Sequence, residues 1–133
     1  MPHPPLPTRA EDVPAAFAER FNGGDPEAVR ELYEERAAFV PESGTPVHGI
    51  AAITEANRPF LAIGLPISVR PRHVHVCGDI ALLIVDWEIE GVVGSTATDV
   101  ARRGADGCWR YVIDSPFGAA GAAPAGDGQA RLA

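Results

Sequence analysis

The sequence predicts one α+β domain, a curved antiparallel sheet with three N-terminal helices packed on its concave face. Apolar residues recur at helical spacing in the first half of the chain, and they alternate with polar residues from Ile67 onward. Short turn signals separate the alternating stretches, as they do where successive strands pair antiparallel. A curved sheet covered in this way encloses an internal funnel that is open at one end.

Length, composition and charge limit the class of protein. With 133 residues, of which 46% are hydrophobic and 22% charged, the chain has the make-up of one globular domain with a single core. A net charge of −7 without any basic run argues against a nucleic-acid partner. No stretch reaches the roughly eighteen apolar residues of a membrane span, so we also expect no membrane partner.

The first helix follows a proline-rich start. Residues 1–11 predict a flexible N-terminal arm. Asp12 is suited to cap a helix whose first turn holds Pro14, and Gly23 is suited to end it. The apolar stripe of this helix consists of Val13, Phe17 and Phe21.

Two more helices and a short strand complete the first half. Asp25 and Pro26 start a second short helix, whose buried side consists of Val29, Leu32 and Tyr33. Residues 37–40 predict a short strand. A third helix is expected over residues 50–63, and Pro59 should kink it or end its regular part.

Residues 69–76 and 80–90 predict a hairpin around a two-residue turn, Gly78-Asp79. Pairing Cys77 with Ile80 gives four further opposed pairs: His75 with Leu82, Val74 with Leu83, His73 with Ile84, and Arg72 with Val85. The second strand has one face, expected to form the cavity wall, that carries Val85, Trp87 and Ile89.

Residues 95–103 and 108–114 predict a second hairpin, closed by the loop at residues 104–107. Pairing Arg103 with Cys108 assigns to one face Ala97, Asp99, Ala101, Arg110, Val112 and Asp114. The same pairing assigns to the other face Thr98, Val100, Trp109, Tyr111 and Ile113. A slip of one residue would dissolve this grouping, because successive side chains point to opposite faces.

The first of these faces holds the candidate catalytic residues, Asp99, Asp114 and Arg110. Two carboxyls close together in a poorly hydrated pocket cannot both ionise at low cost. One of them then keeps a proton near neutral pH and can serve as an acid or a base. Alternatively, Arg110 bridges the two carboxylates as a structural ion-pair network that holds both ionised.

The order of elements resembles the nuclear transport factor 2-like superfamily, a cone-shaped α+β fold, and within it the SnoaL-like, ketosteroid-isomerase-like group with its small SgcJ/EcaC-type proteins. The segments that carry the resemblance are FNGGDPEAVRELYEE, GIAAI, GDIALLIVDWEI, TDVARR and DGCWRYVIDSP. They span a domain over residues 12–118. The Ala- and Gly-rich residues 119–133 predict a disordered tail.

The resemblance implies a cavity for a small hydrophobic ligand or substrate. In ketosteroid isomerases an acid donates a hydrogen bond into this cavity from the position that Asp99 matches. The catalytic base of the first strand has no counterpart, because Phe39, Val40 and Pro41 stand there, and the first helix lacks the isomerase tyrosine. Steroid isomerisation itself is therefore not expected. The residues expected to contact a ligand are Phe17, Phe21, Tyr33, Phe60, Val85, Trp87 and Val112.

The expected function is cofactor-free acid–base chemistry, such as isomerisation or cyclisation of a small hydrophobic or polyketide-like carbonyl substrate. One alternative is a non-catalytic ligand-binding or interaction domain of the same fold. Another follows the limonene-type epoxide hydrolases of the superfamily, which use an Asp–Arg–Asp set. In that case Arg110 would have to replace the arginine that is missing at Ala97.

Neither a cofactor nor a metal ion is expected. No glycine-rich phosphate loop follows a strand. His73 and His75 share one strand face, but no third metal ligand has a diagnostic spacing. Cys77 and Cys108 have no paired spacing either, so we expect reduced thiols in a cytoplasmic protein.

The second face of the last hairpin has no helix to cover it in the predicted topology. Its apolar residues are Val100, Trp109, Tyr111 and Ile113. An uncovered apolar sheet face usually marks an interface, and sheet-to-sheet dimers are common in the superfamily. We therefore predict a homodimer through the outer sheet face.

Overall fold

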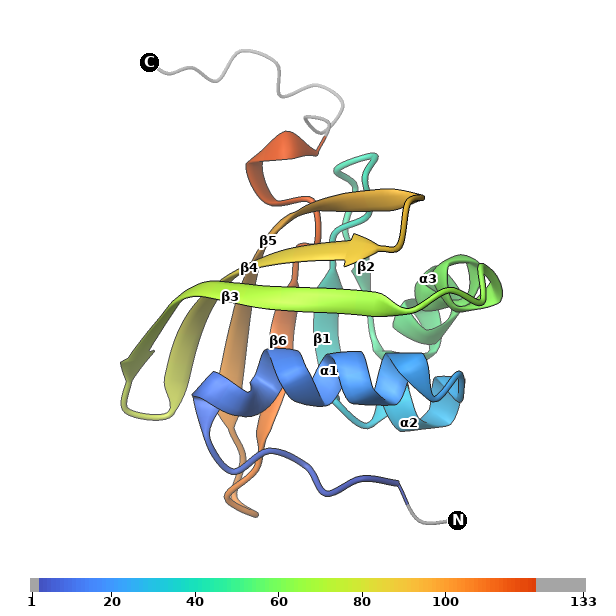
Figure 1. Ribbon diagram of the computed structural model, residues 1–133. Helices are drawn as coiled ribbons and strands as arrows, with labels where there is room; N and C mark the ends of the chain where they lie inside the picture. The colour runs from blue at the N-terminus through green and yellow to red at the C-terminus, as the bar shows by residue number, and fades with distance from the viewer. Residues whose placement is uncertain (1–2, 122–133) are drawn as a thin grey trace, which may run out of the picture.

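The computed structural model describes residues 3–121, and it confirms the predicted α+β class. Three α-helices pack against one curved, unclosed sheet, whose strands follow the order β2-β1-β6-β5-β4-β3 (Figure 1). The helices are α1 (Val13–Asn22), α2 (Pro26–Arg30) and α3 (Ile50–Ala62), with short 3-10 turns η1 (Ala10–Asp12) and η2 (Gly118–Ala120). The strands are β1 (Tyr33–Phe39), β2 (Val47–His48), β3 (Ile67–Cys77), β4 (Ile80–Ile89), β5 (Val93–Arg103) and β6 (Trp109–Asp114). No helix in this part of the chain is long and apolar enough to cross a membrane.

The helices begin where the local signals predict, but the Asp12 side chain makes no capping hydrogen bond to α1. Pro14 lies in the first turn of α1, and the Asp25 side chain caps α2 by accepting a hydrogen bond from the Glu27 amide at 2.9 Å. Pro59 does not end α3, which continues to Ala62. The carbonyl that Pro59 leaves without a partner belongs to Glu55, and both residues are exposed, so water can satisfy it.

The assignment of Tyr33 to the second helix was wrong, because α2 ends at Arg30 and Tyr33 begins β1. The Tyr111 amide donates a hydrogen bond to the Leu32 carbonyl at 2.7 Å, and β1 runs parallel to β6 from this point. Pairing with a strand almost eighty residues away therefore overrides the local helical pattern. It also brings the Tyr33 side chain under the concave face of the sheet.

The β3–β4 hairpin has the predicted register at its turn, with His75 opposite Leu82. Further along, a bulge places Pro71, and not Arg72, opposite Val85. Proline has no N–H to give to a ladder, and β3 lies at the edge of the sheet, where an irregular pairing costs least. The inner face of β4 remains as predicted.

The β5–β6 hairpin differs from the predicted register by one residue at its turn. Arg103 lies opposite Trp109 instead of Cys108. Cys108 belongs to the loop, where its amide donates to the Asp106 carboxylate at 3.0 Å and its carbonyl accepts from the Gly104 amide at 2.8 Å. With its backbone groups used in this way, Cys108 cannot start the ladder.

This register exchanges the two faces of β6. Trp109 and Tyr111, predicted on the outer face, are buried on the concave side, while Arg110 and Val112 are only half-buried and turn outward. A bulge near Val112 then shifts the pairing again, because Ala101 lies opposite Tyr111 and the preceding Val100 lies opposite Ile113. The bulge returns the next residue, Asp114, to the concave side.

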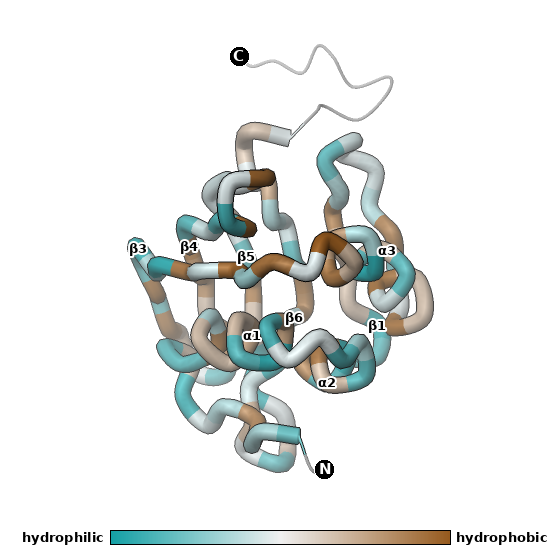
Figure 2. The backbone as a smooth tube through the Cα atoms, turned by 45° about the vertical axis from the view of Figure 1, so that its right-hand side comes forward, coloured by the Kyte–Doolittle hydropathy of each residue, from teal (hydrophilic) through white to brown (hydrophobic). Residues whose placement is uncertain are grey.

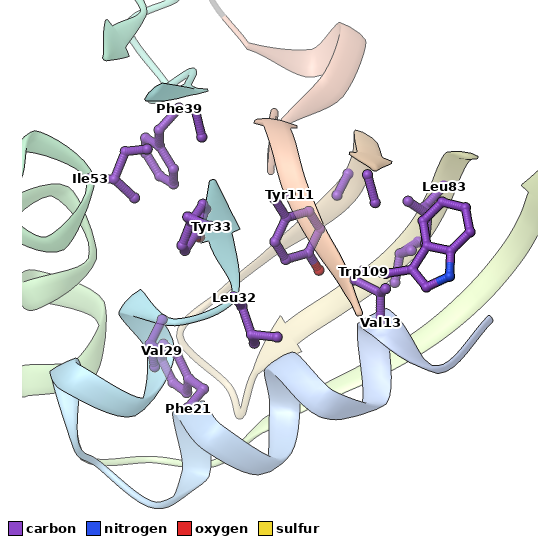
Figure 3. Packing of buried hydrophobic residues seen from close by; sticks show 14 of the residues in the cluster. Val13, Phe21, Val29, Leu32, Tyr33, Phe39, Ile53, Leu83, Trp109 and Tyr111 are labelled. Atoms are coloured by element: carbon purple, nitrogen blue, oxygen red, sulfur yellow. The ribbon is translucent and has the colours of Figure 1, made fainter. Parts of the chain in front are cut away.

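The core lies between this concave side and the helices. Figure 3 shows the two tyrosines, Tyr33 and Tyr111, side by side, with ring centroids 5.4 Å apart. Leu83 from the sheet and Val13 from α1 are fully buried. Hydrophobic and hydrophilic segments alternate along the strands in Figure 2, as expected for strands with one buried and one exposed face.

The segment expected as a flexible arm is described from His3 onward and contacts the domain. Arg20 of α1 is buried, and its guanidinium donates to the carbonyls of Pro4 and Ala28 and to the Glu31 carboxylate. Of the segment expected as a disordered tail, residues 119–120 belong to η2, and residues 122–133 lie outside the described residues.

Candidate active-site cavity

A cavity of about 60 Å³ lies between the concave face of the sheet and helices α1 and α3. Six aromatic side chains make up much of its wall: Phe17, Phe21, Phe39, Phe60, Trp87 and Tyr111. Besides Tyr111, its polar lining consists of Asn57, Asp99 and Asp114, and none of its lining residues is Arg, Lys or His. One water needs about 10–15 Å³ of such space, so the cavity has room for about four waters.

Asp99 and Asp114 meet at this cavity as direct neighbours on β5 and β6. Their residues are only 4% and 6% exposed, and their carboxyl groups are hydrogen-bonded to each other. The backbone amide of Ser115 donates to Oδ1 of Asp99 at 2.8 Å. The pairing follows from the bulge in β6, without which Asp114 would point away from Asp99.

A second chain of hydrogen bonds supports Asp114 from the other side. The Tyr33 hydroxyl donates to Oδ2 of Asp114 at 2.5 Å, and Nδ2 of Asn57 donates to the Tyr33 oxygen at 3.2 Å. Asn57 comes from α3 and Tyr33 from β1, so three distant segments hold one carboxyl group. Asp114 therefore receives hydrogen bonds suited to its ionised form.

The electrostatics of the two carboxyls differ. Burial, followed by the charge of Asp114 and the hydrogen bond to it, raises the pKa of Asp99 well above its usual value. Burial also raises the pKa of Asp114, but the hydrogen bonds from Tyr33 and Asp99 oppose this rise. The arrangement therefore favours one shared proton, carried by Asp99, with Asp114 ionised.

Arg110 does not join the two aspartates. Its guanidinium forms a two-point ion pair with the loop residue Asp106, at 3.1 and 2.8 Å. The hydrogen bond from Arg110 lowers the pKa of Asp106 to about 2. The predicted Asp–Arg–Asp cluster is therefore not formed, because the register of β6 turns Arg110 to the outer face.

The structure brings most of the predicted ligand-contact residues to the cavity. Its lining includes Phe17, Phe21, Phe60, Val85 and Trp87. Trp87 is oriented by a hydrogen bond from its indole N–H to the Pro116 carbonyl at 2.6 Å and by edge-on contact with Phe60. Tyr33 does not line the cavity but supports Asp114, and Val112 lies on the outer face.

Sequence reasoning missed several residues of the cavity, among them Tyr111, Phe39 and Asn57. Tyr111 was missed because alternation was counted through a loop whose true length was unknown. Asn57 had a usable signal, since it is a polar residue within the apolar stripe of the third helix. Such a residue needs a hydrogen-bond partner when it is buried, and here the partner is the Tyr33 hydroxyl.

No metal site accompanies the carboxyl pair in the part of the chain that the structure describes. Within residues 3–121, no three His, Cys, Asp or Glu side chains come close enough to bind one metal ion together. The stacked rings of His73 and His75 lie on β3, outside the cavity lining. The polar chemistry of the cavity thus comes from its carboxyl, hydroxyl and amide groups.

A curved sheet that encloses a cavity with its helices defines a small ligand-binding α+β fold. The SnoaL-like domain family matches residues 15–114, and the chain belongs to this family. No curated protein matches the sequence at a significant level.

Solved structures with this fold have diverse descriptions. A Thiobacillus denitrificans domain, provisionally described as a calcium/calmodulin-dependent protein kinase type II association domain, is 24% identical, with a TM-score of 0.69 over 86% of this chain and 99% of its own. A ketosteroid isomerase-like protein from Erwinia carotovora atroseptica is 18% identical, with a TM-score of 0.59 and coverage of 80% and 90%. The epoxide hydrolase/cyclase-like enzyme SalBIII, of pyran ring formation in salinomycin, is 19% identical, with a TM-score of 0.60 and coverage of 81% and 88%. At these identities the similarity shows the shared fold alone.

Proposed function

We propose that the protein carries out cofactor-free proton transfer, such as isomerisation or cyclisation, on a small apolar carbonyl compound. The observation that carries this proposal is the buried Asp99–Asp114 pair, hydrogen-bonded at an otherwise mostly apolar cavity. A carboxyl held protonated beside an ionised one supplies an acid and a base at the same pH. The family and its cyclase-like and isomerase-like structural neighbours are consistent with such chemistry.

The two carboxyls have different roles in this proposal. The ionised carboxylate of Asp114 takes the proton from the carbon next to the carbonyl group and becomes a carboxylic acid. In a substrate with a C=C bond next to the carbon that loses the proton, the electron pair of the broken C–H bond moves into a dienolate, whose oxygen accepts a hydrogen bond from protonated Asp99. Asp114 returns the proton to the far carbon of that C=C bond, which shifts the double bond and completes an isomerisation without any cofactor. Arg110 is left out, because it is paired with Asp106 outside the cavity.

A carboxyl-carbon NMR titration tests the proposal, with Asp99→Asn and Asp114→Asn variants to assign the signals. We expect one carboxyl of the wild-type pair to titrate at about pH 6 or above. Removing Asp114 takes away a neighbouring charge, so the titration of Asp99 should move to lower pH in Asp114→Asn. If both carboxyls of the wild type titrate below about pH 4, acid–base chemistry at this pair is wrong.

A non-catalytic ligand-binding domain is the second candidate. It is supported by Phe39 in the cavity wall, on the strand where ketosteroid isomerases carry their catalytic base. Carbonyl compounds would then raise the thermal stability of the protein without being converted. Conversion of any bound carbonyl compound, lost in Asp99→Asn or Asp114→Asn, would exclude this candidate.

We also infer that the protein is a homodimer through the outer face of the sheet. Leu82, Val100 and Ile113 lie side by side there on three neighbouring strands, and Ile80 next to them is exposed. We expect sedimentation to give a dimer for the wild type and a monomer for Ile113→Asp. Val92→Asp is the matched control, because Val92 is exposed but lies in the turn after β4. A wild-type monomer, or a dimer unaffected by Ile113→Asp, would contradict the inference.

A cytoplasmic location is proposed on the state of the two cysteines. Cys77 and Cys108 are both free, and Cys77 is exposed. Free exposed thiols persist in reducing compartments. Secretion by the producing cell would contradict this location, and cell fractionation measures it.

A further inference from the structure

The two acidic residues of the cavity lining, Asp99 and Asp114, are buried and face no cation in that lining. The hydrogen bonds from Tyr33 and Asp99 favour the ionised form of Asp114, which places a negative charge there. The arginines of the neighbouring elements have other partners: buried Arg20 binds Glu31 and two carbonyls, and Arg110 binds Asp106. A buried charge without a counter-ion is costly, so a ligand that supplies a positive charge gains this missing compensation.

The cavity wall is suited to the rest of such a ligand. Its six aromatic side chains are Phe17, Phe21, Phe39, Phe60, Trp87 and Tyr111. Aromatic rings attract organic cations through their negative faces and also bury hydrocarbon. The available space of about 60 Å³ limits the enclosed part of the ligand to a small group.

A tyrosine hydroxyl without a hydrogen-bond partner also points to a ligand. Tyr111 is 4% exposed and lines the cavity. Its hydroxyl has no hydrogen-bond partner among residues 3–121, whereas the hydroxyl of Tyr33 donates to Asp114 and accepts from Asn57. Tyr111 lines the same cavity as Asp99 and Asp114. A tyrosine oxygen can accept a hydrogen bond from an ammonium group.

We propose that the cavity binds small apolar ammonium ions, with the ammonium group on the Asp114 carboxylate and the Tyr111 hydroxyl oxygen, and the hydrocarbon part among the aromatic side chains. This ligand class goes beyond carbonyl chemistry, although it rests on the same carboxyl pair as the proposed function. The same charge should reject carboxylates of equal size. The cavity therefore selects its ligands by charge as well as by shape.

Three probes of similar size and different charge test this proposal: benzylamine, benzyl alcohol and benzoate. Their dissociation constants are measured on the full-length protein at neutral pH by amide NMR shifts. We expect benzylamine to bind about tenfold tighter than benzyl alcohol, and benzoate to bind more weakly than both. Equal or tighter binding of benzyl alcohol or benzoate, or no binding of benzylamine, would overturn the proposal.

Variants then locate the charge. Asp99→Asn keeps the hydrogen bonds to Asp114 and its charge, so benzylamine should retain its advantage over benzyl alcohol. The double variant Asp99→Asn/Asp114→Asn should lose this advantage, and Tyr111→Phe should reduce it about fivefold. An advantage that survives in a folded double variant would overturn the proposal. The probe series on the wild type decides the matter even if that variant does not fold.

The outcomes of the two proposals can be told apart. A titration that places both carboxyls below about pH 4 rejects proton transfer, yet the pair then has more negative charge and benzylamine should still bind best. Conversely, a carboxyl that titrates near neutral pH together with tighter binding of benzoate rejects only the ammonium site.

Discussion

Replacement of Trp109 by alanine is expected to lower the free energy of unfolding by about 3–5 kcal/mol, the range of large-to-small changes at a buried tryptophan. The Trp109 side chain is 3% exposed in the core, its backbone amide donates to the Pro7 carbonyl at 2.8 Å, and the guanidinium of Arg103 lies 5.8 Å from the ring centroid. Alanine would leave a cavity that these neighbours cannot fill. Urea denaturation followed by circular dichroism measures the change.

Ile113→Ala is the matched control for Trp109→Ala. The alternating pattern predicted the same outer face for both residues, but Ile113 is 39% exposed. Because less of its apolar surface is buried, its truncation in a monomer should cost no more than about 1 kcal/mol. A loss at Ile113 as large as that at Trp109, measured at a concentration where the protein is monomeric, would refute the observed register of β6.

Asp99→Asn is expected to stabilise the protein at pH 8 and to have little effect at pH 4. The pKa of Asp99 is raised in the folded state, so the folded protein binds its proton more tightly than the unfolded chain does. The corresponding stability is fully present below the unfolded pKa of 3.8, and it is lost as the pH rises through the folded pKa. Each pKa unit by which the folded value exceeds the unfolded value contributes about 1.4 kcal/mol to this stability. Urea denaturation at several pH values gives the difference between variant and wild type.

Asp86→Asn supplies a control with the opposite sign. Hydrogen bonds from Thr96 and Arg72 lower the pKa of Asp86, so its contribution is present above the unfolded pKa of 3.8 and is lost as the pH falls through the folded pKa. Asp86→Asn should therefore destabilise the protein at pH 8. If the difference in the free energy of unfolding between Asp99→Asn and wild type does not grow with pH, Asp99 is not held protonated by burial.

Patterns within a single element were predicted well from the sequence. The start of α1 at its proline, the cap of α2 at Asp25 and the turn at Gly78-Asp79 depend on neighbouring residues. The inner face of β4 with Val85 and Trp87 also follows from alternation along one strand. In each case the deciding interactions lie within a few residues of the signal.

Features that join two distant elements were predicted less well. Tyr33 has a helical pattern locally, but pairing with β6 makes it part of a strand and directs its hydroxyl to Asp114. Arg110 and Val112 were assigned to the cavity face by alternation counted from an assumed loop of four residues. The structure gives Cys108 to that loop, and one extra residue turns both side chains outward.

The sequence by itself determined the α+β class, the helix starts and the presence of two aspartates on the last two strands. Only the tertiary structure decided that Asp99 and Asp114 meet at the cavity, because a loop of unexpected length and a later bulge both act on the same strand. Each of these shifts turns side chains from one face to the other, and together they return Asp114 to the concave side. Strand alternation is a local property, whereas register depends on loop closure and on pairing with β1, which the local sequence does not encode.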